Sequence, residues 1–383
     1  MLELTGHSSA AQERERQTAS AIITTLKAAG LMLVMLHHFA RSVWRGEKRD
    51  APAITQWQYL EKVDSFGVPH SYPGIAGAVL EWLATWGFLG VHLFIVASGI
   101  GLGLRYANEA PRWGEFLSRR VIKILLPAWA ALVLYFLLEW LLGRSVDPAV
   151  LLRKMLMISF FIESEFFAIV TPLWYIATIF QLYLLFPLLL RCGQRWPWAT
   201  FIVCLAVALV YRHLMQCVNG NCTNQYWGHG GALNWLAVFY AGICVGKLWG
   251  RGLLVPLPRY ALAVGAAALW GVYAFSQSVP AFYALGDSSF ALGALALMLA
   301  GGALWHLPGR WSQPLAQHSY GAYLYHRPLF AMLAWRWSRW VGDSPTLILL
   351  GGLVACAAMV AVVAGVSRLT TRYRGLRMFF FGQ

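Results

Sequence analysis

Charged side chains are scarce in this sequence. Aspartate, glutamate, lysine and arginine together make up 12% of the 383 residues, about half of the roughly 25% found in soluble domains. Hydrophobic residues make up 59%. This leaves too little polar surface to cover a water-soluble fold. The composition therefore excludes a soluble globule and predicts an all-α, polytopic membrane protein.

Acidic residues are particularly few. The chain has 16 aspartates and glutamates against 30 lysines and arginines, which gives a formal net charge of +14. A basic balance can indicate nucleic-acid binding, but here the basic residues stand at the ends of apolar runs. We interpret them as topology signals that face anionic lipid, and we predict membrane lipid as a partner and no nucleic acid.

Cysteine is sparse as well, and its spacing suggests no zinc-type cluster, so no metal is predicted. Four cysteines lie in or beside apolar runs and are expected to be buried structural residues: Cys192, Cys204, Cys244 and Cys356. Cys217 and Cys222 bracket a turn-rich tetrapeptide. A disulfide between them is plausible if that loop faces an oxidising compartment, and two free thiols are the alternative.

Long apolar runs, by contrast, are abundant. A spanning helix needs about 20 mostly apolar residues, and ten segments qualify, at roughly 21–40, 84–104, 121–142, 171–190, 198–215, 232–249, 259–278, 282–305, 320–341 and 346–367. They predict a tail over 1–20, one transmembrane domain over 21–367 and a basic tail over 368–383. A shorter apolar piece at 151–169 is predicted to be re-entrant or interfacial.

The distribution of basic residues orients these spans. With ten spans and a cytoplasmic N-terminus, inner segments hold 18 lysines and arginines and outer segments hold 11. Arg327 lies inside a span. This bias predicts that both termini are cytoplasmic. The long outer stretch at 41–83 could cap a cavity that opens outward.

The first apolar segment carries Lys27 and His38, which are eleven residues apart. At about 1.5 Å per residue they are separated by roughly 16 Å along a helix, and three turns put them on nearly the same side. Ionisable residues inside spans are usually functional. Together they could engage two parts of one long ligand. The alternative is an interfacial lysine and a pair of histidines, His37 and His38, near the outer headgroups.

A basic cluster opens the third segment. Arg119 and Lys123 are four residues apart and are expected on one helix face, with Arg120 beside them. Three cations at the inner start of a helix make a plausible phosphate site. Ordinary positive-inside flanking is the alternative interpretation.

Two later segments add candidate residues. Trp174 and Tyr175 open the fourth segment, where they either bind substrate or belong to an interfacial aromatic belt. In the ninth segment, Ser319 precedes Tyr323 and His326, and the last two share a helix face. A histidine this deep in a span is not tolerated against lipid.

These segments together resemble the acyltransferase-3 family of integral membrane acyltransferases, which O-acylate cell-surface glycans. The first segment is similar to the family's Arg-x10-His pattern, with Lys27 in place of arginine and His38 as the histidine. Residues 90–99, GVHLFIVASG, resemble the family's GVDLFFVLSG, with His92 in place of aspartate. FLSRRVIKILLP, PLWYIATIFQLYLLFP and SYGAYLYHRPL resemble further family segments in the same order.

The resemblance implies an O-acyltransferase of the bacterial cytoplasmic (inner) membrane. The donor would be acyl-CoA, most simply acetyl-CoA, and the acceptor a hydroxyl of an exopolysaccharide, O-antigen or related glycan, with other polysaccharide-synthesis proteins as possible partners. Its cofactor-binding residues would be Lys27, Arg119, Arg120 and Lys123; its catalytic residues His38, His326 and Tyr323; and its substrate-binding residues Trp174, Tyr175, His92 and Ser319.

The chemistry of acyl transfer fits these roles. The reaction needs a base for the acceptor hydroxyl, and a neutral imidazole such as His38 suits that task. A transient acyl-imidazole is the other route open to His38. Two alternative functions use the same intramembrane residues: a transporter of a glycan intermediate or small anion, and a non-catalytic subunit of a polysaccharide synthase.

Overall fold

The chain folds into a bundle of helices. The computed structural model describes residues 3–46, 74–141, 143, 147–159, 162, 165, 173–217, 231–253, 258–278, 283–301, 309–341, 344–370 and 373–382. Within these ranges the regular secondary structure is helical and contains no strand. The all-α class predicted from composition is therefore confirmed.

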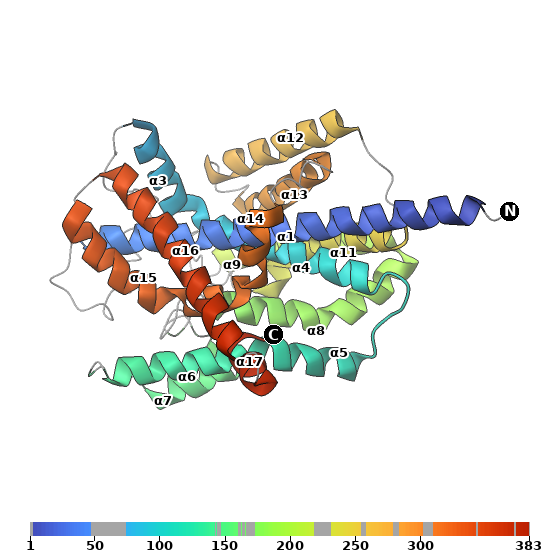
Figure 1. Ribbon diagram of the computed structural model, residues 1–383. Coiled ribbons are helices and arrows are strands. Elements are labelled where there is room, and N and C mark those ends of the chain that lie inside the picture. Colours follow the sequence, from blue (N-terminus) through green and yellow to red (C-terminus); the bar gives the residue numbers. More distant parts are fainter. Residues whose placement is uncertain are drawn as a thin grey trace.

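Long helices form the body of the bundle, and short ones join or cover them (Figure 1). The long α-helices are α1 (Glu3–Gly46), α4 (Gly90–Arg105), α6 (Leu126–Leu141), α8 (Trp174–Arg195), α9 (Pro197–Cys217), α11 (Leu236–Gly250), α12 (Arg259–Ser278), α13 (Tyr283–Gly301), α15 (Ser319–Val341) and α16 (Pro345–Leu369). The shorter ones are α3 (Gly74–Trp86), α5 (Trp113–Arg120), α7 (Pro148–Met155), α14 (Gly309–Gln317) and α17 (Arg374–Phe381). Two 3-10 turns, η1 (Gly87–Leu89) and η6 (Ala232–Trp235), precede α4 and α11, and a π-helical turn, η2 (Val121–Leu125), joins α5 to α6.

Several helices are long and apolar enough to cross a membrane, so the chain is a multi-pass membrane protein. Within the described ranges there are seven: Gln17–Arg41, Gly87–Arg105, Trp113–Leu141, Trp174–Arg195, Pro197–Met215, Ala232–Gly250 and Pro345–Leu369. The three other predicted spans coincide with the helices α12, α13 and α15, which are not among these seven. The total of ten spans stays a prediction.

Helix α1 lies at the centre of the bundle, where it packs against α4, α15, α14 and α16 (Figure 1). Its buried side chains include Leu26, Leu31, Met35 and Phe39. Neighbouring helices therefore surround the middle of this helix. This placement brings Lys27 and His38 into the interior of the domain.

Helices α4 and α11 pack closely against each other, and glycines permit it. Gly99 and Gly103 of α4 face Gly242 and Gly246 of α11. A Cβ atom on Gly103 would overlap the carbonyl oxygen of Ile243, and one on Gly246 would overlap that of Ile100. Small residues one turn apart let two membrane helices approach backbone to backbone, which favours van der Waals packing.

Three sequence predictions fall partly outside the described residues. Most of the outer stretch at 41–83 lies there, but α3 is described and packs against α1 and α16. The short apolar piece at 151–169 begins within α7, whose first N–H groups are capped by Asp147. Cys222 lies outside the described residues, so the possible bond to Cys217 stays a prediction.

Candidate functional site

A pocket of about 430 Å³ opens among α1, α4, η2, α8, α15 and α17. It contains six of the site residues predicted from the sequence: Lys27, Arg120, Lys123, Tyr175, Ser319 and Tyr323. These residues come from segments far apart in the chain. Their convergence on one cavity is the arrangement that a binding site for a single long ligand requires.

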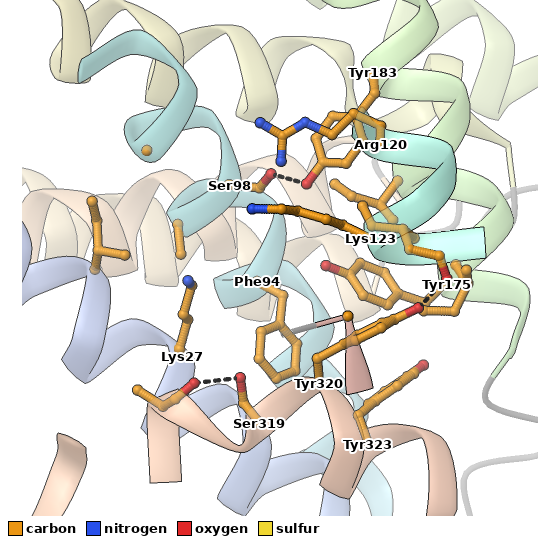
Figure 2. Close-up of a pocket in the computed structure, with 18 of the residues that line it drawn as sticks. Lys27, Phe94, Ser98, Arg120, Lys123, Tyr175, Tyr183, Ser319, Tyr320 and Tyr323 are labelled. Atoms are coloured by element: carbon orange, nitrogen blue, oxygen red, sulfur yellow. Dashed lines mark hydrogen bonds between the residues drawn. The ribbon is translucent and has the colours of Figure 1, made fainter. Parts of the chain in front are cut away.

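Three cations share one end of the pocket. Lys27 extends from α1, Arg120 from the end of α5 and Lys123 from η2, and Figure 2 shows their nitrogen atoms pointing into a common space. None of the pocket-lining residues, all of which belong to the described part of the chain, is acidic. Three positive charges in a partly enclosed space attract a polyanion such as a group of phosphates.

Aromatic rings hold Arg120 in place. Its guanidinium carbon lies 5.1 Å from the ring centre of Phe116 and 5.0 Å from that of Tyr183. These distances are typical of cation–π contacts. The Tyr183 hydroxyl is in turn hydrogen-bonded to the Ser98 hydroxyl at 2.6 Å (Figure 2). The positive head is therefore oriented without an acidic partner that would neutralise it.

A π-helical turn, η2, follows Arg120 and carries Lys123. Its wider turn is seen in the Leu126 N–H, which bonds the carbonyl of Val121, five residues earlier. Arg120 and Lys123 both line the pocket. The Tyr320 hydroxyl of α15 donates a hydrogen bond to the carbonyl of Ile124 and ties η2 to α15.

Arg119 lies elsewhere. It forms an ion pair with Glu115, one turn earlier on α5, and both side chains are about half exposed. The expected joint site of Arg119 and Lys123 does not form, since Lys123 lines the pocket and Arg119 does not. The structure thus divides the predicted basic cluster into two pocket residues and one surface residue.

Aromatic side chains form the other end of the pocket. The ring centre of Tyr175 lies 5.5 Å from that of Tyr323, and the ring centre of Phe94 lies 6.1 Å from that of Tyr323. We call Phe94, Tyr175 and Tyr323 the aromatic cluster. Trp174 packs beside Tyr175, with ring centres 6.4 Å apart, and does not line the pocket. Ser319 lines the pocket and bonds the carbonyl of Ala316 at 2.8 Å.

A pair of histidines lies directly behind the aromatic cluster. The rings of His38 and His326 are 5.1 Å apart, and the His326 ring is 5.9 Å from that of Tyr323. His326 is fully buried, and its Nδ1–H donates to the Tyr323 carbonyl at 2.7 Å. This bond leaves Nε2 as the second ring nitrogen, and no described residue makes a hydrogen bond to it. With the proton on Nδ1, the Nε2 atom of the neutral ring is a hydrogen-bond acceptor.

The neighbouring His37 has a different environment. Its Nδ1–H donates to the Leu83 carbonyl at 3.1 Å, and its ring packs 6.1 Å from that of Phe88. The His37 side chain therefore links α1 to α3 and to the 3-10 turn η1. One residue along the helix rotates a side chain by about 100°, so His37 has other neighbours than His38, although the two rings lie 5.1 Å apart.

His92 does not enter the pocket. It is fully buried beside Trp235, whose ring centre is 4.5 Å away, and beside Phe290 at 5.7 Å. Asn234, the residue before Trp235, is a second polar group in this region. Its side-chain oxygen accepts a hydrogen bond from Arg212 at 3.5 Å. Arg212 is a buried arginine within the candidate span Pro197–Met215. Sequence reasoning missed it, although charge inside a span is a functional signal.

His318 lies at the turn between α14 and α15, next to the pocket residue Gln317. Its side chain is buried, and that burial, with Arg368 and Arg377 nearby, holds the pKa of its imidazole below the usual range. Protonation of the His318 imidazole is unfavourable because the surroundings are already positive. His318 is therefore neutral at neutral pH, and the pocket's positive charge comes from its lysines and arginine.

These features define a class of protein. A multi-pass membrane protein with a cationic pocket and an adjoining pair of histidines, of which His326 is fully buried, has the parts needed for group transfer within a membrane. No group of three or more potential metal ligands occurs among the residues that the structure describes.

The family comparison gives the particular identity. The family model described as an acyltransferase domain, that of the acyltransferase-3 family, matches residues 21–367, nearly the whole chain. The chain belongs to this family and is a membrane acyltransferase, as the sequence motifs predicted. A search of curated proteins and a search of solved structures gave no match.

Proposed function

We propose that this protein transfers an acyl group, most simply acetyl, from cytoplasmic acyl-CoA to a hydroxyl of an exopolysaccharide, O-antigen or related surface glycan. The observation that carries the proposal is the cationic pocket whose far end adjoins the His38–His326 pair. Coenzyme A has phosphates at one end and a thioester at the end of a long flexible arm. A binding site for coenzyme A therefore needs positive charge at one end and the reacting side chains at the other.

In this proposal the cations bind the donor. Lys27, Arg120 and Lys123 hold the phosphates at the inner end of the pocket. The pantetheine arm extends past the aromatic cluster towards the histidines. The distance is suitable, because His38 is roughly 16 Å along α1 from Lys27. A donor from the cytoplasm could then serve an acceptor that approaches from the outer side.

The histidines manage the proton. His38 takes the proton from the acceptor hydroxyl as its oxygen attacks the thioester carbonyl. The new C–O bond forms, the C–S bond breaks, and coenzyme A leaves as a thiol that receives a proton. His326, oriented by its bond to the Tyr323 carbonyl, supports His38 from the other side. A transient acyl group on His38 is the second route that this geometry allows.

The decisive experiment measures the reaction directly. The full chain, purified in nanodiscs, is mixed with acetyl-CoA carrying a radiolabelled acetyl group, with and without extracted surface glycan. We expect coenzyme A release and label transfer to the glycan as an alkali-labile ester. A protein that neither binds coenzyme A nor turns over its acetyl ester would refute the proposal and favour a transport or scaffold role.

The basic residues provide the next prediction. Arg120→Ala and Lys123→Ala should each raise the KM for acetyl-CoA by about tenfold or more, with little change in kcat. Each substitution removes a charge-assisted contact worth about 1.5–3 kcal/mol that acts in the ground and transition states alike. Steady-state kinetics over a range of donor concentrations measure both constants.

Arg119→Ala is the matched control. Arg119 is adjacent in sequence but pairs with Glu115 on an exposed surface, so its loss should leave the KM for the donor unchanged. If Arg119→Ala weakens donor binding as much as Arg120→Ala does, general surface charge would explain the effect and the pocket would not be a donor site.

Orientation is a further part of the proposal. We place both termini in the cytoplasm of a bacterial inner membrane, because the basic residues are biased towards inner segments. A reporter that is active only in the cytoplasm, fused after Arg368, should be active. A reporter active only outside the cytoplasm, fused at the same point, should be silent. The reverse pattern would require an odd number of spans and would turn the cationic end of the pocket outward.

A further inference from the structure

The short helix α17, which follows the last candidate span, contributes to the pocket wall. Phe381 at its end and Gly382 after it both line the cavity that holds Lys27, Arg120 and Lys123. The helix packs against α6, η2 and α15, and Figure 1 shows it crossing the bundle beside α5 and α6. The segment lies outside the residues matched by the family model, which end at 367.

Gly382 fits the pocket wall because it has no side chain. Its φ is +66°, in the left-handed region that glycine adopts readily, and its N–H caps α17 by bonding the Met378 carbonyl at 3.0 Å. A Cβ atom there would overlap the carbonyl oxygen of Lys123. The backbone of α17 is therefore seated directly on the π-helical turn that presents Lys123 to the pocket.

Phe381 is fixed from the opposite side. Its side chain is only 5% exposed, and its ring lies 6.1 Å from that of Tyr325 on α15. The Tyr325 hydroxyl donates to the Phe380 carbonyl at 3.1 Å. Gly321 leaves the room for the ring, because a Cβ there would come within 2.9 Å of Phe381 Cδ1. Phe381 is thus a buried aromatic wall beside the cationic end of the pocket.

We propose that Phe381 and Gly382 are positioning residues of the donor site. Gly382 supports the backbone of Lys123, so that its ammonium group stays in the pocket. Phe381 provides an apolar surface beside the cations, where the uncharged part of coenzyme A next to its phosphates would lie. This inference rests on the proposed donor, and it adds the segment 374–382 to the site that binds it.

The test compares buried with exposed positions of the same segment. Phe381→Ala and Gly382→Val should each weaken coenzyme A binding to the full chain in nanodiscs at least fivefold, measured by calorimetry, with kcat for saturating acetyl-CoA within about twofold of wild type. Phe379→Ala and Gly375→Ala are the controls. Phe379 is 38% exposed and no atom lies within 4 Å of a Cβ at Gly375, so both should bind coenzyme A as wild type does.

The outcomes separate a failure of this inference from a failure of the proposed function. If Phe381→Ala lowers the melting temperature, Phe381→Leu, which keeps most of the apolar volume, replaces it and should still weaken binding about threefold. Wild-type affinity in the Phe381 and Gly382 variants, beside weakened binding in Lys123→Ala, would overturn this inference alone. Absence of coenzyme A binding by the wild-type protein would instead refute the proposed function.

Discussion

Replacing His38 with alanine is expected to lower kcat by about 100-fold or more. General-base contributions to enzymatic rates are typically of this size or larger, and a nucleophilic role would give an even greater loss. The KM for acetyl-CoA should change little, because the cations that hold the donor are roughly 16 Å away along α1. The measurement is single-turnover and steady-state release of coenzyme A by purified variants.

His37→Ala is the control for this experiment, since His37 lies at the same depth in the same helix. Its ring bonds the Leu83 carbonyl and packs near Phe88 and the His38 ring, whereas the ring of His38 contacts that of His326. Its loss should lower stability by about 1 kcal/mol, the usual contribution of one hydrogen bond, and leave most of kcat. Equal activity of the two variants, or an inactive His37→Ala beside an active His38→Ala, would remove His38 from the mechanism.

Gly246→Ala should have the largest effect on folding. The new methyl group would overlap the carbonyl oxygen of Ile100, and a backbone atom cannot move aside as a side chain can. Overpacking of this kind costs about 1–3 kcal/mol and sometimes more. We expect the variant to give much less monodisperse protein after detergent extraction and a clearly lower melting temperature.

Gly265→Ala on α12 is the matched control. No atom lies within 4 Å of a Cβ at that position, so the same substitution in another apolar helix should be neutral or slightly stabilising. If both glycine variants lose the same yield, the close contact of α4 with α11 is not what holds the bundle together. The lower yield of both variants would then result from poorer insertion into the membrane.

Sequence reasoning predicted the helical segments well because each depends on local composition. About 20 apolar residues in a row have few alternatives to a helix in lipid, and helices occur at each of the ten predicted positions. The close pairing of α4 with α11 was not predicted. It depends on which glycines face each other across two helices, and that relation appears only in three dimensions.

The site was predicted unevenly for a similar reason. Lys27, Arg120, Lys123 and Tyr323 stand in segments with family motifs, and they meet in one pocket. Arg119 stands in the same motif, but it pairs with Glu115 on the surface and does not line the pocket. Tyr183 belongs to a segment that resembles the family, so the motif itself offered a signal for it. Phe381 had none, because it lies beyond the family segments and acts through packing.

The pocket is assembled from residues that are made at very different times. Lys27 comes from the first helix, and Phe381 follows the last candidate span. At synthesis rates of about 5–20 residues per second, roughly 20–70 s separate their appearance on the ribosome. During that interval the nascent chain can insert helices but has no complete wall around its cations. The growing polypeptide would therefore insert into the membrane without binding coenzyme A. The ability to bind coenzyme A would arise only when synthesis has reached Gly382.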